Sequence, residues 1–201
     1  MATAELFVDP AVSRAKFERE LADYRKLADE YARRGWWMIK AEFPEVFVVF
    51  AAPQLKPPAV VFGALLDFTN YDFLPPSVRL VDPFTREPYK GKNLPVPLLR
   101  RSQLAPLPIN SINDSSDLPP QALMQFHNPE DIPFLCMPGV REYHQHPAHS
   151  GDLWLLHRDR GEGRLFFILD HLYRYGVAPL QAYHIQLAIS GLGLLQGDVP
   201  E

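Results

Sequence analysis

The distribution of proline constrains the fold of this chain more than any other feature of its sequence. Of the 21 prolines in 201 residues, 16 lie between Pro53 and Pro138. Proline has no backbone N–H and fixes φ at about −65°, so a long helix or an uninterrupted central strand is excluded wherever prolines are this frequent. We therefore expect short strands and rigid loops in this part of the chain, with an irregular proline-rich insertion over residues 84–133.

Regular elements are expected on both sides of the insertion. Asp9 and Pro10 form a helix start, and apolar residues recur at three- and four-residue spacing from there to Gly35. Segments rich in valine and aromatic residues predict an antiparallel meander over residues 36–83. An apolar face predicts a helix over residues 163–176, and a second helix follows from about Pro179. We therefore expect one α+β domain over residues 1–201, with the N-terminal helix packed on the meander and two C-terminal helices.

Composition and charge argue against nucleic-acid and membrane partners. The chain has 20 basic and 24 acidic residues, and no basic stripe extends beyond the pair Arg100 and Arg101. No stretch approaches the roughly 18 apolar residues that span a bilayer, and the first residues lack the basic and apolar regions of a leader. We therefore expect a soluble, cytoplasmic protein. Its lone cysteine, Cys136, cannot form a disulfide within the chain.

Residues 70–83 and 146–156, NYDFLPPSVRLVDP and HPAHSGDLWLL, resemble two motifs of the ubiquitin-conjugating (UBC) fold. The first is similar to the family's turn, in which an aromatic pair and two prolines precede a strand. Pro75 and Pro76 would fix the backbone of this turn and stop sheet pairing, and we expect Tyr71 and Phe73 to pack it against the core. The second is similar to the family's His-Pro-Asn motif and the catalytic cysteine that follows it. Ala148 stands in the asparagine place and Trp154 at about the cysteine place. The resemblance implies the fold without its conjugating chemistry, because alanine has no side-chain donor for an oxyanion.

A candidate metal site lies within residues 134–158. The stretch CMPGVREYHQHPAHSGDLW, residues 136–154, holds the only cysteine and three of the seven histidines. If residues 140–147 are extended, Glu142, His144 and His146 point to one face at about 6.7 Å per two residues. A turn at Pro138 and Gly139 would then bring the Cys136 thiol alongside the histidines.

The same stretch resembles a bacterial family predicted to bind metal and encoded beside ubiquitin-like conjugation components. That family has an ordered Cys, Glu, His, His set, which corresponds here to Cys136, Glu142, His144 and His149, with His146 as an alternative for one histidine. One thiolate, one carboxylate and two imidazoles suit tetrahedral zinc. Other roles stay open: Cys136 could be a buried apolar residue or a nucleophile activated by a nearby histidine, and Glu142 could be the general base of a hydrolytic site.

These resemblances imply a function in protein modification. The expectation is a noncatalytic, zinc-binding component of a bacterial ubiquitin-like conjugation system, which binds the modifier or its activating or conjugating enzyme. The alternatives are an active conjugating enzyme that carries the modifier on Cys136, and a zinc hydrolase that acts on modifier conjugates.

Overall fold

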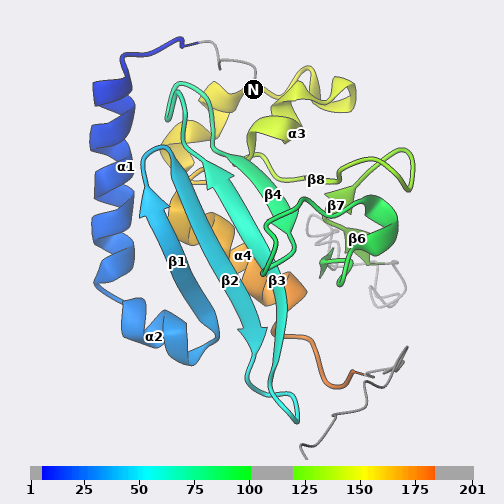
Figure 1. Cartoon of the computed structure of the whole chain (residues 1–201). Coiled ribbons are helices and arrows are strands. Elements are labelled where there is room, and N and C mark those ends of the chain that lie inside the picture. The colour runs from blue at the N-terminus through cyan, green and yellow to red at the C-terminus, as the bar shows by residue number, and fades with distance from the viewer. Residues whose placement is uncertain (1–5, 101–119, 184–201) are drawn as a thin grey trace, which may run out of the picture.

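The computed structural model describes residues 6–100 and 120–183 and has a mixed α+β architecture, as predicted. Its central sheet is an antiparallel meander in the order β1-β2-β3-β4, with the bounds Trp36–Glu42, Glu45–Ala52, Ala59–Asp67 and Ser77–Val81. Helix α4 (Leu165–Gly176) lies behind this sheet in Figure 1, and α1 (Pro10–Arg25) runs along its β1 side. The predicted meander is thus confirmed, and the helices α1 and α4 of the described residues pack on one of its faces.

The N-terminal helical region begins where the sequence predicts and is divided in two. The Asp9 carboxylate accepts a hydrogen bond from the Ala11 N–H at 2.8 Å, which caps α1. A second helix, α2, covers Ala28–Arg33 and ends before Gly35. Gly35 has a φ of +92°, and a Cβ there would lie 2.2 Å from the carbonyl oxygen of Ala51. Only glycine therefore allows the chain to turn so tightly into β1.

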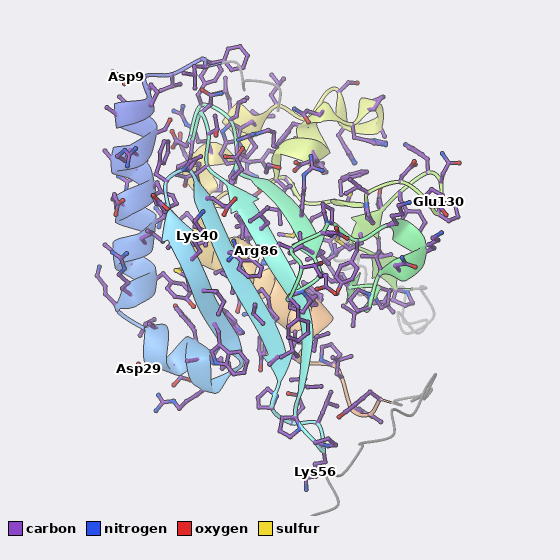
Figure 2. The ribbon with its side chains drawn as sticks, in the orientation of Figure 1. Asp9, Asp29, Lys40, Lys56, Arg86 and Glu130 are labelled. Atoms are coloured by element: carbon purple, nitrogen blue, oxygen red, sulfur yellow. The ribbon has the colours of Figure 1, made fainter. Side chains whose placement is uncertain are left out.

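The main core lies between the sheet and the helices. Trp36 is fully buried and stacks on Tyr31, with ring centroids 4.8 Å apart. The buried face of α4 contains the four predicted residues, Leu165, Ile168, Leu169 and Leu172, together with Gly176. A smaller cluster on the other sheet face contains Phe47, whose ring lies 4.5 Å from the Arg86 guanidinium carbon. Figure 2 shows Arg86 and Lys40 on this face.

In the described residues of the proline-rich region beyond β4, 84–100 and 120–135, the elements are short. They are the 3₁₀ helix η1 (Gly91–Asn93) and the two-residue strands β5 (Leu99–Arg100), β6 (Gln121–Ala122), β7 (Met124–Gln125) and β8 (Phe134–Leu135). Strand β5 pairs with β6, and β7 pairs with β8. Figure 2 places Glu130, in the loop between β7 and β8, at the outer edge of the molecule.

The segment after β8 is helical where an extended chain was considered. Its elements are α3 (Arg141–Gln145) and the 3₁₀ helices η3 (Pro147–His149), η4 (Trp154–Leu156) and η5 (Arg158–Arg160). The extended arrangement of residues 140–147 is therefore wrong. Of the second predicted C-terminal helix, residues 180–183 are not helical and the remainder lies outside the described residues. Within residues 6–100 and 120–183, every helix is too short or too polar to cross a bilayer.

Candidate functional site

Arg141 fixes the histidine-containing segment to the proline-proline turn. Its guanidinium group donates to the carbonyl oxygens of Pro75 at 3.2 Å, Thr69 at 2.6 Å and Asp67 at 3.3 Å. It also lies 3.2 Å from the Asp67 carboxylate. The Arg141 backbone N–H donates to the Pro76 carbonyl oxygen at 3.0 Å. The start of α3 is thus held against the turn by one side chain, which is 15% exposed.

Glu142 faces the sheet. Its carboxylate accepts hydrogen bonds from the Ser77 hydroxyl and, at 3.3 Å, from the Val78 backbone N–H, at the start of β4. His144 is occupied in a different way: Nδ1 lies 2.7 Å from the Asp152 carbonyl oxygen, and Nε2 lies 2.5 Å from the Pro138 carbonyl oxygen. With each ring nitrogen facing an acceptor, His144 directs no free lone pair toward a metal.

Cys136 and His149 are brought together by the fold. The Cys136 Sγ lies 3.6 Å from the His149 Nε2, although the two residues are 13 positions apart. The His149 ring stacks on Tyr143, with centroids 3.9 Å apart. Burial raises the pKa of the Cys136 thiol, which is 9% exposed. Burial therefore disfavours the thiolate form that a poised nucleophile needs.

His146 forms a second pair, with a residue that the sequence did not single out. Its Nε2 lies 3.1 Å from the Nε2 of His127, which follows β7. The ring of Phe134, in β8, stacks on His146 at a centroid distance of 4.9 Å. The His146 Nδ1 also accepts a hydrogen bond from the Ala148 N–H at 3.3 Å, which closes the turn after the His-Pro pair.

The predicted metal ligands thus lie in different environments and do not all face one another. Cys136 and His149 lie together, His146 pairs with His127, and Glu142 and His144 are held by other partners. Among residues 6–100 and 120–183, no three His, Cys, Asp or Glu side chains converge as metal ligands would. The set of one cysteine, one glutamate and two histidines does not fit a shared ion in this geometry, and zinc binding stays a prediction.

Asp152 links a polar network that sequence reasoning missed. Its carboxylate accepts hydrogen bonds of 2.6 Å from the Tyr143 hydroxyl and from the His157 Nε2. The His157 Nδ1 lies 2.7 Å from a Glu162 oxygen, but the N–H is not aligned for a hydrogen bond. The bond from His157 and then that from Tyr143 lower the pKa of Asp152. His157 is not among the candidate site residues that the sequence predicts.

Replacing Asp152 should reduce the acid sensitivity of the fold. Because the pKa of Asp152 is lowered in the folded state, its stabilising effect is present above the ordinary carboxyl pKa and is lost as pH falls through the folded value. We expect Asp152→Asn to be less stable than the parent at neutral pH and to lose less stability between about pH 5 and pH 2. Urea unfolding at a series of pH values measures this difference. Asp159→Asn, at a carboxylate that is 90% exposed, is the control and should retain the parent's pH dependence.

The proline-proline turn has one buried and one exposed aromatic residue. Tyr71 is buried, packs edge-on against Phe68 and donates its hydroxyl to the Glu20 carboxylate at 3.3 Å. Pro75 and Pro76 are also buried. Phe73, however, is 53% exposed, so the prediction that it packs against the core is wrong. Its ring instead lies 5.9 Å from that of Phe7.

Trp154 stands beside this turn. It is 7% exposed, and its Nε1 donates to the Asp72 carbonyl oxygen at 2.9 Å. Its neighbours Leu153 and Leu155 are both exposed. Phe7 and Phe73 are in ring contact, and Leu153 and Leu155 flank Trp154 in the chain; we call these four exposed residues the Phe73 surface. Exposed apolar side chains of this kind are candidates for a protein interface.

The comparisons with known proteins cover nearly the whole chain. Residues 8–180 match the model of the Y4jH-like family. The uncharacterized protein y4jH of Sinorhizobium fredii (strain NBRC 101917 / NGR234) is 48% identical over 199 residues, which are 96% of this chain and 97% of that protein. Neither description names an activity, a metal or a conjugating fold. The chain therefore belongs to the Y4jH-like family.

Proposed function

We propose that this protein is a noncatalytic, UBC-like, zinc-binding component of a bacterial ubiquitin-like conjugation system. Its task is to bind the modifier or the activating or conjugating enzyme of that system. The observation that carries the proposal is that Trp154 is buried and hydrogen-bonded to the proline-proline turn. By the resemblance to the UBC family, Trp154 falls at about the place of that family's nucleophile. Beside it lies the exposed Phe73 surface, which can receive a partner.

The order of elements supports the UBC-like part of the proposal. A capped helix precedes a four-stranded antiparallel meander, and the turn with Pro75 and Pro76 lies between β3 and β4. The His-Pro pair, the short helix with Trp154 and helix α4 follow in the order that the resemblance implies.

The side chains of Trp154, Ala148 and Cys136 argue against conjugating activity. A thioester-forming enzyme needs a thiolate and a donor for the oxyanion. Indole carbon atoms at Trp154 and a methyl group at Ala148 supply neither. Cys136 offers a thiol, but its burial raises the pKa of that thiol and so disfavours the reactive form.

Binding through the Phe73 surface gives the first test. We expect Phe73→Asp and Leu155→Asp each to weaken binding of the purified modifier, or of its activating or conjugating enzyme, by at least about tenfold, because each places a charge in an apolar contact. Isothermal titration calorimetry measures the loss. Phe84→Asp is the matched control, since Phe84 is 82% exposed and lies in the loop after β4. Equal losses for all three variants, or no binding by the parent protein, would count against the proposal.

The enzymatic alternatives predict different products. A conjugating enzyme would form a thiol-sensitive adduct with the modifier in the presence of its activating enzyme and ATP, and Cys136→Ser would abolish it. A hydrolase would release modifier from a preformed conjugate and would stop when a chelator is added. We expect neither product from the parent protein. Either of them would replace the noncatalytic proposal.

The zinc part of the proposal needs a different ligand set from the predicted one. Glu142 and His144 are held by Ser77, Val78 and two backbone carbonyl groups. Cys136 and His149 keep the geometry of a potential ligand pair. Zinc would act structurally here, by holding the chain between β8 and η3 in place.

A further inference from the structure

We infer that a zinc-type divalent ion binds this protein through Cys136, His149, His146 and His127, with His127 replacing the glutamate of the predicted set. These residues come from three places in the chain: Cys136 follows β8, His146 and His149 flank or end η3, and His127 follows β7. The inference rests on the zinc part of the proposed function; its test uses the isolated chain, so its failure would leave the proposed binding of the modifier or its enzymes untouched.

Two separations between donor atoms support this ligand set. In a tetrahedral zinc site with bonds of about 2.0 Å to nitrogen and about 2.3 Å to sulfur, two nitrogen ligands lie about 3.3 Å apart, and a sulfur and a nitrogen lie about 3.5 Å apart. The Nε2 atoms of His127 and His146 are 3.1 Å apart. The Cys136 Sγ and the His149 Nε2 are 3.6 Å apart. Each pair therefore already has the spacing of two ligands on one ion.

The two pairs are neighbours. The rings of His146 and His149 have centroids 5.6 Å apart at one 3₁₀ turn. Phe134, which stacks on His146, is two residues before Cys136, and alternate residues of an extended segment point to the same side. The four donor side chains thus form a continuous row between the β7–β8 pair and η3, whereas Glu142 points toward β4.

Bringing the pairs onto one ion requires a local change in η3. Three donors do not yet converge anywhere in the described part of the chain. His146 and His149 would have to turn toward each other, and the 3.3 Å bond from the Ala148 N–H to the His146 Nδ1 would break. The break follows from tautomer chemistry, because a neutral imidazole that binds through Nε2 carries its proton on Nδ1. One weak hydrogen bond is a small loss beside the bonds of a structural zinc site.

An ion could reach this row from solvent. An open pocket of about 290 Å³ is lined by His127, His146, Phe134 and the segment Met124–Phe126. The pocket leads to the His127–His146 pair, and no carboxylate lines it. One thiolate and three neutral imidazoles are a borderline-soft set, which favours zinc and cobalt over magnesium or calcium.

Cobalt titration of tag-free protein tests the inference, because Co²⁺ occupies zinc sites and reports its ligands by absorption. We expect one Co²⁺ per chain, displaceable by Zn²⁺, with intense tetrahedral d–d bands and a thiolate-to-cobalt charge-transfer band. Cys136→Ser should abolish the charge-transfer band. His127→Ala should weaken Co²⁺ binding by more than about tenfold, the loss that even second-shell changes produce. His127 is exposed, so this variant should keep the parent's circular dichroism spectrum.

Two control variants separate this ligand set from the predicted one. Glu142→Gln removes the carboxylate that the resemblance implied, and His171→Gln removes a histidine of α4 that hydrogen-bonds to the Phe167 carbonyl. Both should bind Co²⁺ within about twofold of the parent, since neither removes a ligand. Absence of saturable binding by the parent, or a loss in Glu142→Gln as large as that in His127→Ala, would overturn the inference.

Discussion

Replacing Arg141 by alanine should lower the free energy of unfolding by about 3 kcal/mol, because hydrogen bonds from a charged donor are worth about 1.5–3 kcal/mol each and are not additive. The Arg141 guanidinium group donates to three carbonyl oxygens and one carboxylate around the proline-proline turn. Alanine would leave the carbonyl oxygens of Pro75, Asp67 and Thr69 without this donor. Urea unfolding followed by circular dichroism measures the change.

Two further variants, Arg141→Lys and Arg79→Ala, test whether the loss of stability comes from the Arg141 guanidinium group. Arg141→Lys keeps the charge but lacks the planar group that reaches several acceptors, so we expect it to recover less than half of the loss. Arg79→Ala removes an exposed arginine from β4 and should change stability by no more than about 0.5 kcal/mol. If Arg141→Ala behaved like Arg79→Ala, the guanidinium group would not be what holds α3 to the turn.

The parts of the fold that the sequence predicted are those with strong local signals. Asp9 caps the first helix because its carboxylate meets the Ala11 N–H two residues away. The apolar face of α4 repeats at helical spacing and is buried throughout. The Met137–Val140 turn also follows from its sequence, since Pro138 and Gly139 are typical turn residues and the Val140 N–H donates to the Met137 carbonyl at 3.0 Å.

Errors arose where tertiary contacts decide the conformation. Helix α3 has only five residues, which is too short for a periodic signal, and Arg141 fixes its start through contacts more than 60 positions away. Phe73 was expected inside because aromatic residues are commonly buried, yet Tyr71 fills the space beneath the turn. The Phe73 ring is left with Phe7 as its aromatic neighbour.

The sequence predicted which segment holds the candidate site, but only some of the contacts between its side chains. The spacing of Cys136 and His149 around a turn suggested that they could meet, and their side chains do lie together. His127 gave no signal, because its approach to His146 depends on the pairing of two-residue strands β7 and β8. Such short strands have no alternating pattern in the sequence, so their register could not be derived from it.

Gly139 is expected to be the least replaceable glycine near the site. A Cβ at this position would lie 1.8 Å from the Glu162 carbonyl oxygen and 2.4 Å from its carbonyl carbon, so the backbone of one segment would have to move. Overpacking in such a place costs about 1–3 kcal/mol and occasionally more; we expect Gly139→Ala to lose about 3 kcal/mol because the obstructing atoms are backbone. Thermal and urea unfolding measure this loss.

Gly151→Ala is the matched control for Gly139→Ala. It lies in the same segment, and a Cβ there would meet no atom within 4 Å. Its stability should change by no more than about 0.5 kcal/mol. Similar unfolding curves for the two variants would mean that the Cys136 segment does not pack against the chain at Glu162. A selective loss in Gly139→Ala would instead show that this contact positions Cys136, three residues earlier, relative to the histidines of η3.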